Sequence, residues 1–150
     1  MSFYSLLLVI HIIAAVCGLG ATFAMPVLMS MPKTVSQAKF AMAVSVGIEK
    51  LAKIGSITLL LTGLIMGFIS PTLFKQGWFI ASIVIYIGVQ PIVAFLLPKY
   101  AKQQASLLEQ QKDDQLPSEY LAIGEKMKHY NIIAQISAII LIILMTIKPF

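Results

Sequence analysis

Residues 3–28 decide the fold class. They read FYSLLLVIHIIAAVCGLGATFAMPVL, with no Lys, Arg, Asp or Glu. At about 1.5 Å per helical residue, this run is long enough to cross the roughly 30 Å hydrocarbon core of a bilayer. Backbone polar groups in lipid must be satisfied within their own segment, so the run is predicted to be an α-helix. Residues 1–10 carry no basic side chain, which favours a retained helix over a cleaved secretory signal.

Three further apolar runs, 54–70, 78–97 and 130–147, have no charged residue in their interiors. The 150-residue chain is 59% hydrophobic and 11% charged, whereas soluble domains carry about 25% charged residues. A soluble fold of this size could not bury so much apolar surface. The sequence therefore predicts an all-α bundle of four transmembrane helices, a single domain over 1–150 that is embedded in the lipid bilayer.

The basic residues indicate the orientation. All 11 are Lys, and only Lys75 and Lys148 lie outside the connections 31–53 and 98–129 with the adjoining span ends, so nine lie on one side. The positive-inside rule places both long connections in the cytoplasm and both termini outside a cell inner (cytoplasmic) membrane. Since this topology accounts for the positive charge, no nucleic-acid partner is expected.

The two long connections are expected to be structured. Phe40, Val44, Ile48 and Leu51 recur at helical spacing, so the second helix is predicted to begin inside the cytoplasm. Residues 101–111 either extend the third helix or form an amphipathic helix lying on the leaflet. Ser118 is expected to cap the fourth helix.

Small and polar residues predict which faces meet, because membrane helices associate through them. On the first helix, His11, Ala14, Ala15, Gly18 and Thr22 share one face, which is expected to point inward. Gly63 and Gly67 form a GxxxG pair, a motif for close approach within the bundle or in a dimer. The other candidates for an internal polar network or for packing are Ser56, Thr62, Ser82, Tyr86, Gln90, Asn131 and Gln135.

His11 is the only ionisable residue well inside an apolar run. Such residues usually face a partner or a cavity, and a buried imidazole can bind haem iron, bind another metal or relay protons. The structural alternative is a neutral His that is hydrogen-bonded to another helix. Antiparallel packing places Met66 and Met145 in the same outer third, where either thioether is a candidate second haem ligand.

Several activities are disfavoured by what the sequence lacks. No acidic residue lies within a span, which argues against a proton-coupled exporter. Cys17 is the only cysteine, so paired thiol redox chemistry is excluded. The motifs of soluble hydrolases, metalloproteases and nucleotide-binding enzymes are missing as well.

Four short motifs resemble the HemJ family of membrane protoporphyrinogen oxidases and its uncharacterised four-helix relatives. They are the Leu-x-x-x-His-Ile-Ile run around His11, Thr62-Gly63-Leu64, Gly77-Trp78 and Lys148-Pro149-Phe150. The resemblance implies that His11 ligates haem. The chain departs from HemJ at Ser82, where a functional Lys is expected, and at Val27, near which an Arg is expected. It therefore looks closer to the uncharacterised relatives.

Two functional hypotheses follow. The first is a haem-associated or redox-linked membrane protein that binds haem b through His11. The missing cations weaken the case for HemJ-like oxidoreductase activity. The second is a non-catalytic accessory or scaffold bundle, acting in a larger membrane complex or as a homo-oligomer.

Overall fold

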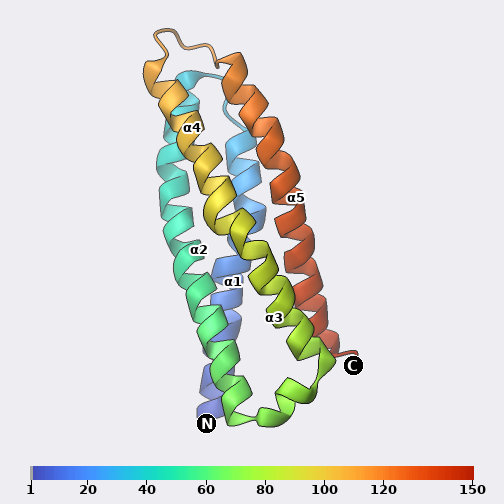
Figure 1. Cartoon of the computed structure of the whole chain (residues 1–150). Coiled ribbons are helices and arrows are strands. Elements are labelled where there is room, and N and C mark those ends of the chain that lie inside the picture. The colour runs from blue at the N-terminus through green and yellow to red at the C-terminus, as the bar shows by residue number, and fades with distance from the viewer. Residues whose placement is uncertain (1) are drawn as a thin grey trace.

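The structure, a computed structural model, describes residues 2–150 as four long helical rods side by side (Figure 1). Each rod is long and apolar enough to cross a membrane. This confirms the predicted all-α architecture. The helices are α1 (Phe3–Ser30), α2 (Val35–Ile69), α3 (Gly77–Gln90), α4 (Leu97–Gln110) and α5 (Ser118–Ile147).

Helices α3 and α4 form one rod, because the π-helical turn Pro91–Leu96 joins them without a break. A proline inside a helix has no N–H to donate, and its ring collides with the carbonyl four residues earlier. A wider turn relieves that collision. The irregularity thus lies at the proline of the third apolar run.

Both long connections lie at one end of the bundle, and both termini lie at the other (Figure 1). The two connections touch, because the Val35 amide donates to the carbonyl oxygen of Asp114 over 3.1 Å. Thr34 and Gln115 also form an isolated antiparallel bridge. The short link between α2 and α3 is the 3₁₀ turn Pro71–Lys75, at the end that holds the termini.

The helices continue beyond the apolar runs toward the end where the connections meet. Helix α2 begins at Val35, which confirms the helix expected over Phe40–Leu51. Helix α4 packs into the bundle through Leu108, which is buried with Val35, Ala38 and Tyr120. The alternative of a helix lying on the leaflet is therefore wrong.

The expected cap at Ser118 is also wrong. The residue that precedes α5 is Pro117, and Ser118 is already the first helical residue. Proline at this position has an extended backbone and no side-chain acceptor, so α5 begins without a side-chain cap.

The core is thin and lies along the bundle axis. Its central cluster takes one buried residue from each rod: Ala14, Leu59, Tyr86 and Leu141. On α1, His11 and Ala14 are buried whereas Ile12 and Val16 are exposed, as the small-residue face predicts. Many large apolar side chains are instead exposed on the outside, where they contact lipid.

Glycines bring α1 and α2 into backbone contact. A Cβ added to Gly55 would lie 2.9 Å from the Ala14 carbonyl oxygen, and one added to Gly18 would lie 3.0 Å from the Ser56 amide nitrogen. The GxxxG glycines have other neighbours: Gly63 faces the His11 ring, and Gly67 faces the rings of Phe74 and Phe79. Gly55, which the sequence reading passed over, sets the closest approach.

Candidate functional site

The His11 imidazole lies between α1 and α2 and is only 7% exposed. Its Nδ1 atom is 2.8 Å from the hydroxyl oxygen of Thr62. Gly63 leaves room for the ring, since a Cβ there would lie 3.3 Å from His11 Cε1. The structure thus brings together two of the four motifs singled out in the sequence, across 51 positions of chain.

The hydrogen-bond geometry of Thr62 fixes the tautomer of His11. The Thr62 hydroxyl lies 2.7 Å from the carbonyl oxygen of Thr58, one turn earlier on α2. A hydroxyl has one proton, and a carbonyl oxygen can only accept. Thr62 therefore donates to Thr58 and accepts from His11 Nδ1–H. The other ring nitrogen, Nε2, then keeps its lone pair.

Two further polar contacts join the helices deeper in the bundle. The Tyr86 hydroxyl on α3 contacts the Ser56 side chain and donates to the Ser56 carbonyl oxygen over 2.7 Å. The Gln135 side-chain amide on α5 donates to the Thr22 carbonyl oxygen over 3.3 Å. With His11 and Thr62, these contacts form three separate links between helices.

The remaining sequence candidates have other surroundings. Ser82 is buried, and its hydroxyl donates to the Trp78 carbonyl of its own helix. Gln90 and Asn131 line a large cavity nearer the end where the connections meet. Met66 is buried on α2, one turn beyond Thr62, about 6 Å further along the axis. Met145 packs against the buried cluster that contains Trp78 and Leu144.

The other two motifs also meet, at the end of the bundle that holds the termini. The Trp78 amide donates to the carbonyl oxygen of Phe150 over 3.0 Å. The Lys148 ammonium lies 5.4 Å from the centre of the Trp78 ring, within cation–π distance. Gly77 leaves room for the Phe150 ring, which lies where a Cβ would stand. This contact fastens the segment after α5 to the first turn of α3.

His11 lines neither of two cavities that lie between the helices. The small one has a volume of about 30 Å³ and lies beside the Ser56–Tyr86 contact. The large one has a volume of about 860 Å³ and is partly open to the outside. No group of three or more His, Cys, Asp or Glu that would hold a metal ion occurs in the described part of the chain.

The sequence reading missed one polar site, at the start of α2. Asp114 Oδ1 accepts from both the amide (2.8 Å) and the hydroxyl (2.7 Å) of Ser36. These two bonds hold the pKa of the Asp114 carboxyl below its ordinary value. In the sequence, Asp113-Asp114 indicates only a chain break, and Ser36 carries no signal that connects it to Asp114.

A family model described as "Predicted integral membrane protein (DUF2269)" matches residues 5–149. The match spans nearly the whole chain, including all four rods. No curated protein and no solved structure matches the chain.

Proposed function

We propose, on the premise that this chain belongs to the DUF2269 family of predicted integral membrane proteins, that its bundle binds haem b with His11 Nε2 as an axial ligand. The supporting observation is the chain of hydrogen bonds from His11 Nδ1 through Thr62 to the Thr58 carbonyl. Metal-binding His residues typically donate their other N–H to a fixed acceptor, which orients the ring and raises its basicity. The likeness of the His11 and Thr62-Gly63 motifs to those of HemJ adds to this support.

The His11 Nε2 atom is a suitable ligand for haem iron. Room for the porphyrin, however, requires neighbouring side chains to move. His11 is 7% exposed and lies outside both cavities. The two proposed second ligands are Met66, one turn from Thr62 on the buried face of α2, and Met145 on α5. A His/Met-ligated haem supplies one-electron redox chemistry. Oxidation of an anionic porphyrinogen is not proposed, because the two cations expected for it are missing. Ser82 stands where a Lys is expected, and Val27 lies near the place where an Arg is expected.

The test is an absorption spectrum of the detergent-purified protein after haem supplementation, with haem quantified as its pyridine complex. The expected result is a Soret band that His11→Ala abolishes. His129→Ala is the matched control, because His129 is exposed on α5. A colourless wild-type protein, or equal loss of haem in the two variants, contradicts the proposal.

The second candidate is a non-catalytic accessory bundle within a larger membrane complex or a homo-oligomer. The close packing around His11 favours it, since a His–Thr hydrogen bond between α1 and α2 is then simply structural. This candidate predicts a colourless protein that co-purifies with a stable membrane complex. It also predicts that His11→Ala lowers stability without dissociating that complex.

We also propose that the protein lies in the cell inner membrane and that the end where the two connections meet faces the cytoplasm. The contact between Val35 and Asp114 puts both connections on one side, and nine of the 11 Lys lie toward it. In a Cys17→Ser background, a membrane-impermeant maleimide applied to intact cells should label Gln76→Cys but not Ser106→Cys. The reverse pattern overturns this orientation.

A further inference from the structure

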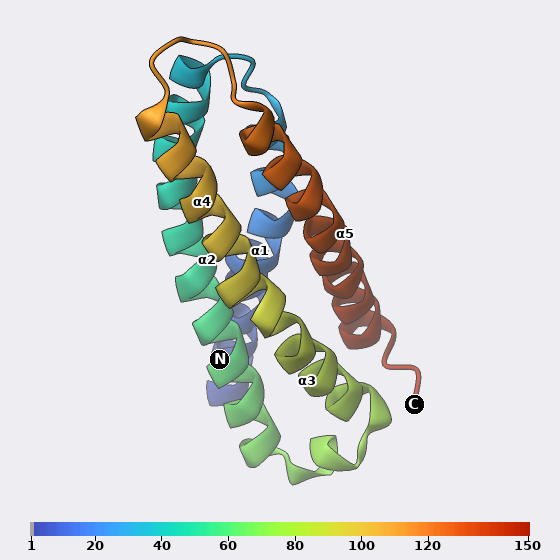
Figure 2. The ribbon, with the colours of Figure 1, turned by 45° about the horizontal axis from the view of Figure 1, so that its top comes forward.

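The 860 Å³ cavity, called here the chamber, has a volume typical of a ligand site. Its lining residues come from α1, α2, the rod formed by α3 and α4, and α5, in the half of the bundle where the connections meet. Figure 2 shows this half of the bundle at the top. The walls of the chamber are mostly apolar. They run along α1 from Gly18 to Ser30, continue to Pro32 in the connection, and run along α5 from Tyr120 to Gln135.

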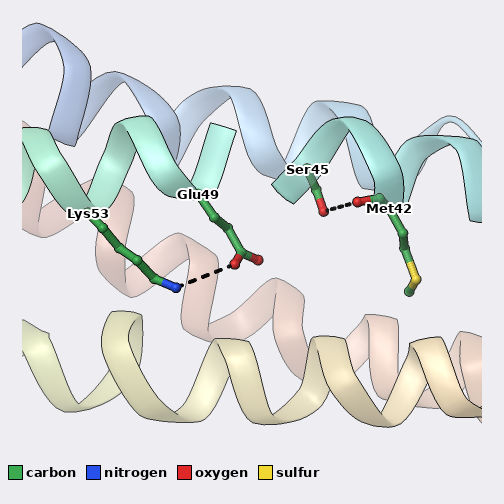
Figure 3. Close-up of polar contacts among 4 residues, drawn as sticks. All are labelled: Met42, Ser45, Glu49 and Lys53. Atoms are coloured by element: carbon green, nitrogen blue, oxygen red, sulfur yellow. Dashed lines mark hydrogen bonds and ion pairs between the residues drawn. The ribbon is translucent and has the colours of Figure 1, made fainter. Parts of the chain in front are cut away.

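The chamber also has charged side chains of both signs. Glu49 and Lys53 line it from α2, and Glu125 and Lys128 line it from α5. Glu49 and Lys53 form an ion pair at 3.9 Å. In Figure 3 both side chains leave α2 on the side that faces α4. The four charges sum to zero, so the chamber presents two cations and two anions to an occupant.

From these charges toward the middle of the bundle, the walls are mostly apolar. Along α5, the wall runs from Lys128 to Gln135, a rise of about 10 Å. Along α1, it runs from Met29 to Gly18, a rise of about 16 Å. Asn131 adds a side-chain amide that forms no hydrogen bond to residues 2–150. An occupant thus needs a head with both charges and a long apolar tail.

We propose that the chamber binds one phosphatidylethanolamine molecule from the leaflet at the end where the connections meet. The phosphate pairs with Lys53 and Lys128, and the primary ammonium donates to Glu49 and Glu125. One acyl chain lies along the apolar wall between α1 and α5. An anionic lipid would bring its negative charge to the two carboxylates, and a choline head has no N–H to donate to them.

This proposal is independent of haem binding at His11, which lines no part of the chamber. The test is native mass spectrometry of the delipidated full-length protein, titrated with ethanolamine, choline and glycerol phospholipids of identical acyl chains. Phosphatidylethanolamine should bind about tenfold more tightly than either competitor, the effect of one additional charged hydrogen bond. A preference for phosphatidylglycerol, or no preference, overturns the proposal.

Matched variants separate the chamber from the charged surface. Lys53→Gln combined with Lys128→Gln should weaken phosphatidylethanolamine binding about tenfold or more. Lys50→Gln combined with Lys126→Gln removes the same charge from neighbouring residues outside the chamber and should leave binding unchanged. Ala94→Phe fills the chamber from α4's rod without altering charge and should abolish binding. Equal weakening by both lysine pairs, or full binding by Ala94→Phe, overturns the proposal.

Discussion

Ser36 donates both its amide and its hydroxyl proton to a single carboxylate oxygen of Asp114, 78 positions further along the chain. The first N–H groups of a helix have no partner within it, and here each finds one. Val35 donates to the Asp114 carbonyl, Ser36 to the Asp114 carboxylate and Gln37 to the Thr34 hydroxyl. The connection between α4 and α5 thus caps α2, and its negative charge suits the positive end of the helix dipole.

The Ser36–Asp114 contact should weaken in acid. The folded-state pKa of Asp114 is lowered, chiefly by the Ser36 hydrogen bonds. Its stabilising contribution is therefore fully present above the unfolded-state pKa of about 3.9 and is lost as the pH falls through the lower folded-state pKa. Hydrogen-exchange protection of the Val35–Gln37 amides, corrected for intrinsic exchange rates, should fall below about pH 4.

Two neighbouring carboxylates provide the control for this pH dependence. Asp114→Asn removes the titrating group, so protection at the start of α2 should no longer change across this pH range. Asp113→Asn should keep the wild-type dependence, because Asp113 bonds Gln111 and the Gln115 amide rather than Ser36. An unaltered pH profile in Asp114→Asn would show that another group controls it.

A second prediction concerns the approach of α1 to α2. Gly55→Ala places a methyl group 2.9 Å from the Ala14 carbonyl oxygen, where backbone must move. Overpacking of this kind typically lowers stability by about 1–3 kcal/mol. Gly47→Ala, on the same helix with nothing within 4 Å, is the control and should be neutral or stabilising by up to about 1 kcal/mol. Thermal unfolding in detergent measures both, and equal midpoints would contradict the assigned role of Gly55.

The faces of the helices were predictable from sequence, but their relative register was not. Hydropathy and small residues place His11 and Ala14 inside because lipid selects apolar side chains for the outside. Periodicity along one helix does not say which turn of α2 lies opposite His11. The Gly18–Gly55 approach sets that register, and it depends on backbone contact between two helices. His11 and Thr62 were therefore identified separately, and only the structure pairs them.

Neither the chamber nor the Ser36–Asp114 cap of α2 was predicted from sequence, because each depends on residues far apart in the chain. The chamber lies between two close contacts, Gly18–Gly55 and Leu108–Tyr120, since Gly18 and Tyr120 both line it. Such a space depends on two distant contacts at once and leaves no local pattern. Two of the lining residues, Lys53 and Lys128, lie close in sequence to Lys50 and Lys126, which do not line the chamber. Sequence position alone does not separate the two pairs.

A third prediction separates the hydroxyl of Thr62 from its shape. Thr62→Val keeps the branched side chain but leaves His11 Nδ1–H without its acceptor. An unpaired buried donor lowers stability by about 1–3 kcal/mol. Thr62→Ser keeps the hydroxyl and should retain most of the stability. If thermal unfolding in detergent shows the Thr62→Val variant to be as stable as the wild type, the His11–Thr62 hydrogen bond does not hold the imidazole in place.

The last prediction concerns Tyr120, whose hydroxyl is buried without a hydrogen-bond partner within residues 2–150. Its ring packs with Val35, Ala38 and Leu108, so the apolar part of the side chain contributes to the contact between the connections and α4. Tyr120→Phe removes only the unpaired oxygen and should leave stability unchanged or raise it by up to about 1–3 kcal/mol. Tyr120→Ala loses the ring as well and should lower stability by roughly 3–5 kcal/mol. Thermal unfolding in detergent ranks the variants, and a clear loss of stability in Tyr120→Phe would reveal an acceptor for this hydroxyl, such as a bound water or lipid.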